Sequence, residues 1–196
     1  MRHGETDWNK PERFRGRADI GLNAQGKQQA EKLASRLLRA PGKFVAIYSS
    51  PLPRALETAE PIAKAFGLAV ESRAELLDVD YGGWEGLSVP EVEEKFSDLY
   101  QTWRARPGRV KFPGGESVRQ VKTRIENFFE ELGEKHRGEN VALVSHRITC
   151  HVALCHALGL NNDNLWRLKQ DLGCINVIQV RDDNYVVAAL NDTSHL

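Results

Sequence analysis

The sequence has no excess charge of either sign. Its 27 basic and 27 acidic side chains cancel to a formal net charge of zero. Proteins that bind nucleic acid or anionic membrane surfaces rely on an excess of Lys and Arg. We therefore expect neither nucleic acid nor a membrane among the partners of this chain.

Long hydrophobic runs and a cysteine framework are also missing. No segment approaches the roughly 20 consecutive apolar residues of a membrane-spanning helix, and the first residues do not resemble a secretory signal. The three cysteines, Cys150, Cys155 and Cys174, are too few and odd in number for a disulfide framework. These absences indicate a cytoplasmic protein.

The cysteines do not indicate a metal site either. A Cys-His pair occurs at Cys150-His151 and again at Cys155-His156. On a helix a spacing of five residues rotates the second pair by about 140° from the first, so the four side chains would not share one face. No Cys-x-x-Cys is present. We predict that the protein uses neither a metal nor another cofactor.

The 196 residues have the composition of a globular protein, with 41% hydrophobic and 28% charged residues, and a length typical of one domain over 1–196. Short apolar runs, which predict strands, alternate with amphipathic segments, which predict helices. Strands are expected over 44–48 and 141–144. Helices are expected over 23–39, from the residues after Pro51 through about 66 with a kink or break at Pro61, over 118–132, and after His146 to 158. This alternation predicts an α/β fold, a three-layer α/β/α sandwich with a mostly parallel central sheet.

Two further segments complete the predicted architecture. Ser88 and Glu91 have the spacing of a capping box with Pro90 between them, so a helix should begin there. Residues 87–115 are interpreted as a lid-like insertion that ends in a loop over 104–116. Runs at 175–180 and 185–190 predict a hairpin that adds an antiparallel edge strand. An exposed edge could pair two subunits, so a homodimer stays open.

Reactive side chains stand at three places: at the N-terminus and after two of the predicted strands. Arg2 and His3 stand at the N-terminus, Arg54 follows the run at 44–48, and His146 follows the run at 141–144. In open α/β sheets, ligands bind beyond the carboxyl ends of the strands and near helix N-termini. We therefore expect two histidines and two arginines to meet in one pocket.

The segment Arg2-His3-Gly4-Glu5-Thr6 resembles the signature of the histidine phosphatase superfamily, also called the phosphoglycerate mutase-like family. The other parts of the family pattern follow in chain order over nearly the whole chain: Asn9, Phe14-Arg15-Gly16, 22–26, Ser50-Pro51-Leu52, Arg54, Thr58-Ala59, 80–86, 114–117 and Val144-Ser145-His146. Within the family, the pattern is similar to α-ribazole phosphatase and the broad-specificity phosphatases.

The resemblance implies phosphoryl transfer through a phosphohistidine on His3, because a neutral imidazole nitrogen is a good nucleophile near neutral pH. It also implies that Arg2, Arg54 and a protonated His146 place positive charge on the phosphoryl oxygens. An alcohol leaves readily only when it is protonated, so a carboxylic acid with a raised pKa is required.

The candidate for this acid is Asp78, four residues before Gly82, where the family more commonly has Glu. Asp80 and Glu85 are the alternatives. For substrate binding, Asn9 matches a family position that contacts the phosphate. Arg15 and Gly16 match a substrate-contacting segment similar to that of fructose-2,6-bisphosphatase.

Three positions depart from the family pattern. Arg15 stands where Gln is common, and its charge favours an acidic or multiply phosphorylated substrate. Arg147 stands where the family usually has Gly, and its side chain could add charge to the pocket mouth or point away. Family members place a strand of about five or six residues before the Arg-His-Gly motif, whereas only Met1 precedes it here. We therefore expect that the sequence begins late and that His3 lacks the strand that should hold it.

The sequence as a whole predicts a cofactor-independent phosphomonoesterase that acts on a small phosphorylated metabolite through a phosphohistidine on His3. The alternative is phosphoryl transfer of the phosphoglycerate mutase type, which the short insertion disfavours. A non-catalytic sensor of phosphorylated ligands is a further alternative, disfavoured because no core residue of the family pattern is lost. Phosphoserine, phosphoglycolate-like acids and sugar phosphates all stay open as substrates.

Overall fold

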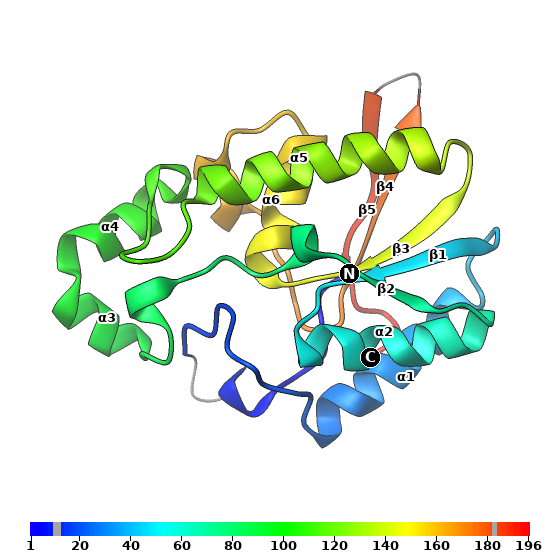
Figure 1. Ribbon diagram of the computed structural model, residues 1–196, viewed down its shortest axis with the longest axis horizontal. Helices are drawn as coiled ribbons and strands as arrows, with labels where there is room; N and C mark the ends of the chain where they lie inside the picture. The colour runs from blue at the N-terminus through cyan, green and yellow to red at the C-terminus, as the bar shows by residue number, and fades with distance from the viewer. Residues whose placement is uncertain (10–12, 182–183) are drawn as a thin grey trace.

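A computed structural model describes residues 1–9, 13–181 and 184–196 of the chain. Figure 1 shows a sheet with helices on both sides. Helices α1 (Ala24–Leu37) and α2 (Pro53–Phe66) cover one face, and helices α5 (Val118–Lys135) and α6 (Arg147–Ala157) cover the other. No helix in these three ranges is long and apolar enough to cross a bilayer.

The central sheet is parallel. Strand β1 (Phe44–Ser49) lies between β2 (Val70–Ser72) and β3 (Asn140–Val144), and Ile47 pairs with Val70 on one side and with Ala142 on the other. Parallel neighbours need crossover connections, which α2 supplies between β1 and β2. The predicted parallel sheet is confirmed.

Two consecutive residues of β1 show why helices cover both faces. Successive side chains of a strand point to opposite faces. Ile47 packs with Leu33 and Ile62 of the α1–α2 side, whereas Tyr48 packs with Phe128 of α5, and all five are buried. Both faces of the sheet therefore bury apolar surface, and the three-layer prediction is confirmed.

Residues 1–3 run beside β3 and pair on both sides. Ser145 N donates to Met1 O (2.9 Å) and His3 N donates to Ser145 O (2.9 Å). On the opposite side, Arg2 N donates to Cys174 O (3.2 Å) and Gly173 N donates to His3 O (3.1 Å). The backbone of His3 is therefore hydrogen-bonded on both sides, although Arg2 and Ser145 form an isolated bridge and residues 1–3 are not a strand. That the sequence begins late stays a prediction.

The predicted C-terminal hairpin is present as strands β4 (Ile175–Arg181) and β5 (Asn184–Asp192). By hydrogen bonding these strands form a two-stranded sheet of their own, and residues 173–174 link that pair to residues 2–3. Two irregularities in the ladder near Val177 bend the strands, as bulges do. Of the predicted turn, residues 182–183 lie outside the described residues.

The helices differ from the prediction at two places. Helix α2 continues through Pro61 to Phe66, so no break occurs there, and Gly67 ends it with a φ of 66°. The insertion contains helices α3 (Val89–Lys95) and α4 (Ser97–Ala105) and the 3-10 turn η4 (Pro107–Arg109), so 104–116 is not entirely loop.

The predicted Ser88–Glu91 capping box is confirmed. Four other 3-10 turns are η1 (Asp7–Asn9), η2 (Ala74–Leu76), η3 (Gly82–Trp84) and η5 (Asn162–Arg167).

The segment after His3 packs directly on the first turn of α1. Asn23 caps this helix, accepting from Gly26 N (2.9 Å), while Asn23 N donates to Glu5 O (3.0 Å). A Cβ on Gly26 would lie 2.1 Å from Glu5 O, and a Cβ on Gly4 would lie 2.6 Å from Gly26 O. The two backbones can approach so closely only because both residues are glycine.

The substitution Gly26→Ala should therefore destabilise the fold. We expect a loss of about 1–3 kcal/mol in the free energy of unfolding, measured by urea titration, because the backbone around Glu5 must move away. Gly133→Ala is the matched control: it lies in α5 with no atom near its would-be Cβ, so it should gain up to about 1 kcal/mol. Equal stability of the two variants would contradict this account of the contact.

Candidate active site

The reactive side chains meet at the carboxyl ends of residues 1–3, β1 and β3, as predicted. His3 and His146 have ring centroids 5.2 Å apart, and both rings are buried. Arg54, in the first turn of α2, contacts His146, and its Nη2 lies 3.8 Å from the carboxylate of Asp78. The predicted cluster of two histidines with nearby arginine and carboxylate is thus present.

The ring of His3 has a fixed orientation. Its Nδ1 lies 2.7 Å from the carbonyl oxygen of Gly4, which can only accept, so Nδ1 carries the proton and Nε2 carries the lone pair. Burial lowers the pKa of His3 well below its ordinary value, and the charges of Arg54 and Arg2 lower it further. His3 is therefore neutral near pH 7, with a free nucleophilic nitrogen.

His146 is also neutral in this arrangement. Arg54 Nε donates to its Nδ1 (3.2 Å), so the proton of the ring is on Nε2, which donates to Ser50 Oγ (2.7 Å). Burial, followed by the charge of Arg54, lowers the pKa of His146 well below its usual range. The expectation of a protonated His146 concerns the state with a phosphoryl dianion bound beside it, and it stays a prediction.

Arg54 is fully buried and is held by carbonyl oxygens rather than by a close ion pair. Its Nη1 donates to Ala18 O (2.8 Å) and its Nη2 to Gly16 O (2.7 Å). Gly16 has a φ of 50°, and a Cβ there would lie 2.1 Å from Glu85 Oε1. Gly16 thus contacts Arg54 through its own main-chain carbonyl oxygen, which accepts a hydrogen bond from the guanidinium.

Of the three carboxyl candidates, Asp78 lies at the site. It is buried, and Val79 N donates to its Oδ1 (3.0 Å). Burial raises its pKa, and this effect outweighs the charges of Arg54 and Arg15, which act in the opposite direction. A carboxyl with a raised pKa can carry a proton, as a general acid must.

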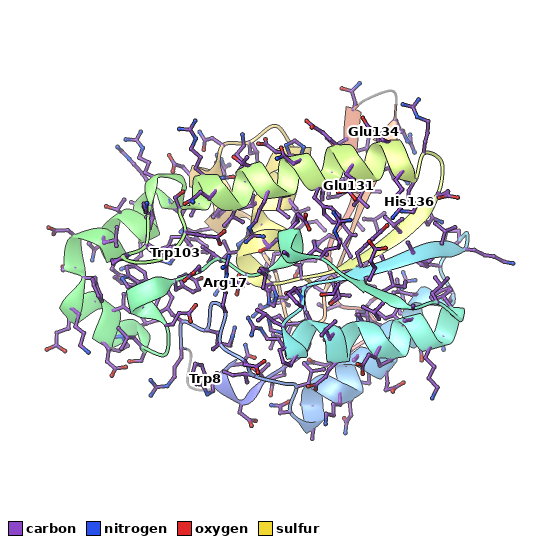
Figure 2. All side chains as sticks on the ribbon, in the orientation of Figure 1. Trp8, Arg17, Trp103, Glu131, Glu134 and His136 are labelled. Atoms are coloured by element: carbon purple, nitrogen blue, oxygen red, sulfur yellow. The ribbon has the colours of Figure 1, made fainter. Side chains whose placement is uncertain are left out.

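The two alternatives are engaged in a neighbouring turn. Asp80 accepts from Gly82 N (2.8 Å), and Glu85 accepts from Arg17 N (2.8 Å). The Arg17 side chain pairs with Asp80 (3.7 Å) and with Glu116 (3.2 Å), and Figure 2 shows it in the middle of the molecule. These residues therefore bind one another and hold the loop around Gly16 in place.

A cavity of about 230 Å³ contains the predicted substrate-binding residues Asn9 and Arg15. Its walls are Arg2, Glu5, Asn9, Arg15, Arg147, Asp171 and Leu172. Asn9 Oδ1 accepts from Thr6 N and Thr6 Oγ1 (both 2.9 Å). Because this fixes the amide, Nδ2 is the group of Asn9 that can donate to a ligand.

Arg2 joins the cavity to the histidines. Its Nη1 donates to Gln170 O (2.6 Å), and its buried Nε has no hydrogen-bond partner among the described residues. Burial, together with the charges of Arg147 and Arg15, lowers its pKa to about 10, so it remains a cation at pH 7. Arg2 thus has a donor available at the site.

Sequence reasoning missed several residues here. Thr58 Oγ1 accepts from Gly4 N (3.1 Å) and donates to Arg54 O (2.7 Å), which ties the two motifs together. Gln170 and Asp171 come from the loop before β4, and no pattern in the sequence marks that loop. Ser50 and Thr58 stood in motifs that had been noted, but without a role. The open question about Arg147 is answered, because it lines the cavity.

The remaining histidines and the cysteines lie elsewhere. His136 caps the C-terminal end of α5, where Figure 2 labels it, and contacts Tyr48 OH (2.8 Å), while His156 pairs with Glu126 (3.2 Å). The three cysteines are free and buried. Within residues 1–9, 13–181 and 184–196, no three His, Cys, Asp or Glu side chains form a set of metal ligands. A larger groove of about 600 Å³, between α5, α6 and η5, contains none of the predicted site residues.

The chain is similar in sequence and in structure to known phosphatases. Phosphoserine phosphatase 1 of Hydrogenobacter thermophilus is 36% identical over 196 residues, which cover 100% of this chain and 92% of that protein. A metal-independent phosphoserine phosphatase of Arabidopsis thaliana is 33% identical over 199 residues, 100% of this chain and 81% of that one. The structure of α-ribazole phosphatase from Shigella flexneri matches with a TM-score of 0.87 at 26% identity, over 98% of this chain and 94% of that one.

The family pattern covers the chain almost from end to end. A model of the histidine phosphatase superfamily (branch 1) matches residues 1–193. The predicted resemblance to the phosphatases of the family, α-ribazole phosphatase among them, is confirmed. The chain belongs to the histidine phosphatase superfamily, branch 1, and is a phosphoric monoester hydrolase.

Proposed function

We propose that this chain hydrolyses small phosphate monoesters in two displacements at phosphorus, with His3 as the nucleophile. The observation that supports this most strongly is the orientation of His3. Gly4 O holds the proton on Nδ1, and the positive charge of Arg2 and Arg54 reaches the same ring. A neutral nitrogen beside fixed cations is suited to attack a dianionic phosphoryl group.

In the first displacement, the lone pair on His3 Nε2 forms a bond to phosphorus while the bond to the alcohol oxygen breaks. Asp78 donates its proton to that oxygen, so the leaving group departs as a neutral alcohol. Arg2 and Arg54 place charge on the equatorial oxygens, and His146 becomes a further donor to them when its Nε2–H turns from Ser50 Oγ to the bound phosphoryl group. Asn9 Nδ2 adds a hydrogen bond from the cavity side.

In the second displacement, the same groups act in reverse. The carboxylate of Asp78 accepts a proton from a water molecule as its oxygen attacks phosphorus, and the bond to His3 Nε2 breaks. Inorganic phosphate leaves, Asp78 is protonated again, and His3 returns to its neutral form. Neither step requires a metal, because the arginines supply the positive charge. Water is thus the acceptor of the phosphoryl group, whereas a mutase would transfer this group to a second substrate.

Replacing the nucleophile tests the first displacement. His3→Ala should lower phosphate release from p-nitrophenyl phosphate by at least about a thousandfold and should abolish acid-labile phosphate on the protein. His156→Ala is the matched control and should keep both, because His156 pairs with Glu126 of α5 and not with the residues of the site. Acid-labile labelling that persists in His3→Ala would overturn the assignment.

Replacing the acid separates the two displacements. p-Nitrophenolate needs little protonation to leave, whereas attack by water still needs a base. Asp78→Asn should therefore release about one equivalent of p-nitrophenol per site in a burst and then turn over at least about a hundredfold more slowly. Stopped-flow absorbance measures this. Asp80→Asn, in the adjacent turn, is the control and should show no such burst. A burst in Asp80→Asn and none in Asp78→Asn would assign the role of general acid and base to Asp80.

The pH dependence follows from the same two groups. His3 must be neutral, and because its pKa lies below the ordinary 6.5, activity should be lost only well below pH 6.5. Asp78 must be protonated for an alkyl leaving group; its pKa lies above the ordinary 3.8, so activity should fall as pH rises through that higher value. Profiles of kcat for phosphoserine should therefore show both limbs. A profile that is flat on the alkaline side would contradict the role of Asp78.

A further inference from the structure

Arg124 of α5 binds the main chain that carries Asp78. Its Nη1 donates to Glu75 O, and its Nη2 donates to Asp78 O (3.2 Å). Its guanidinium also pairs with Glu116, whose Oε1 lies 3.4 Å from Nε. The two displacements do not use this side chain. Because the donors of a guanidinium lie in a rigid planar fork, one group can hold both ends of the segment 75–78 at a fixed distance.

Two hydroxyl groups bind the carbonyl oxygens between these ends. Ser145 Oγ donates to Leu76 O (2.7 Å), and Thr149 Oγ1 donates to Leu77 O (2.7 Å). Both donor residues are buried, and they lie at the N-terminal end of α6. Each carbonyl oxygen of residues 75–78 therefore accepts from a side chain, and no strand in the described part of the chain pairs with this segment.

Glu116 extends this support to the turn after Asp78. Its carboxylate accepts from Asp80 N (3.1 Å), and its own main-chain N donates to Asp80 O (2.9 Å). Arg17 Nη2 lies 3.2 Å from the same carboxylate. Arg124 thus binds the main chain up to Asp78, and its partner Glu116 binds the main chain beyond it.

The reach of an aspartate depends closely on its main chain. One methylene group separates the carboxyl of Asp78 from its Cα, whereas the family more commonly has Glu here, with two. Val79 N donates to Oδ1 (3.0 Å), and Arg54 Nη2 lies 3.8 Å from Oδ2, so the carboxyl also has a fixed orientation. A general acid must lie within hydrogen-bonding reach of the leaving oxygen, and a displacement of about 1 Å can cost about a hundredfold in rate.

We propose that Arg124 is a positioning residue for the general acid, which holds the segment 75–78 so that the carboxyl of Asp78 reaches the leaving-group oxygen. This inference rests on the proposed hydrolysis at His3 and on the role of Asp78 in it. Arg124 acts on the leaving group only through Asp78. Its loss should therefore affect each ester in proportion to how much that ester needs an acid.

Two esters that differ by one nitro group test the proposal. Phenyl phosphate has the poorer leaving group and needs the acid more than p-nitrophenyl phosphate does. Because kcat/KM reports the first displacement, Arg124→Met should lower it about tenfold or more for phenyl phosphate and less than about twofold for p-nitrophenyl phosphate. Arg119→Met, an exposed change in the same helix, is the matched control and should alter neither value. Equal losses with both esters, or no loss with either, would overturn the proposal.

A second variant covers a folding defect in Arg124→Met. Arg124→Lys keeps the charge beside Glu116, but one ammonium group cannot reach the carbonyl oxygens of both Glu75 and Asp78. It should again lower kcat/KM for phenyl phosphate, by at least about threefold, with little change for p-nitrophenyl phosphate. A value for phenyl phosphate equal to that of wild type would contradict the need for the fork.

A double-mutant cycle shows whether Arg124 acts through Asp78. Asp78→Asn removes the acid, so Arg124→Met added to it should cost less than about twofold further in kcat/KM for phenyl phosphate. A second loss of about tenfold, independent of the first, would mean that Arg124 acts elsewhere and would overturn the proposal.

Hydrogen exchange tests the position of the acid without turnover. The amide of Val79 donates to Asp78 Oδ1 and so reports where this side chain lies. Arg124→Met should speed the exchange of this amide about tenfold or more and leave that of Ile47 in β1 unchanged. Unchanged exchange at Val79 would overturn the positioning role.

The outcomes separate this proposal from the hydrolysis itself. If wild type releases no phosphate from any ester, the hydrolysis at His3 is overturned, and the exchange at Val79 decides the role of Arg124. If wild type hydrolyses both esters and Asp78→Asn keeps kcat/KM for phenyl phosphate, Asp78 is not the acid and the proposal falls with it. If Asp78→Asn loses that activity and Arg124→Met does not, only the role of Arg124 is overturned.

Discussion

The rest of the site depends on the hydrogen bond between His3 Nδ1 and the carbonyl oxygen of Gly4. This bond fixes which nitrogen carries the proton and leaves Nε2 as the nucleophile. It holds only because the Gly4 backbone is itself fixed, by Thr58 Oγ1 and by the close approach of Gly26. The pairing of residues 2–3 with Ser145 and Gly173 fixes the same backbone from the sheet side. The fold therefore determines the chemistry through main-chain geometry.

The second constraint is that the positively charged guanidinium groups of the site are buried. Burying a guanidinium is costly unless its donors are satisfied. Here the hydrogen-bond acceptors of these guanidinium groups are mainly main-chain carbonyl oxygens: those of Ala18 and Gly16 for Arg54, and that of Gln170 for Arg2. Carbonyl groups neutralise no charge, so the positive potential remains for a phosphoryl group, and it also keeps His3 and His146 neutral. Asp78 is the nearby carboxyl, and its raised pKa limits how much of that potential it cancels.

Sequence reasoning predicted what depends on local pattern. The Asn23 cap, the apolar face of α5 and the Ser88 capping box follow from spacing alone, and the motif order led to His3, Arg54 and His146. What it could not predict depends on contacts between distant segments. Burial, followed by the charge of Arg54, lowers the pKa of His146, and Gln170 and Asp171 reach the site from a loop whose position only the folded sheet determines. The separate β4–β5 pair reflects residues 1–3 lying between it and β3.

The stereochemistry at phosphorus tests the central claim most directly. A phosphorothioate monoester made chiral with two oxygen isotopes would be hydrolysed in water that carries the third isotope, and the configuration of the inorganic thiophosphate determined by phosphorus NMR. Attack by His3 followed by attack by water inverts the configuration twice, so the account predicts overall retention. Overall inversion would mean that water attacks the ester directly, and it would contradict the phosphohistidine on His3.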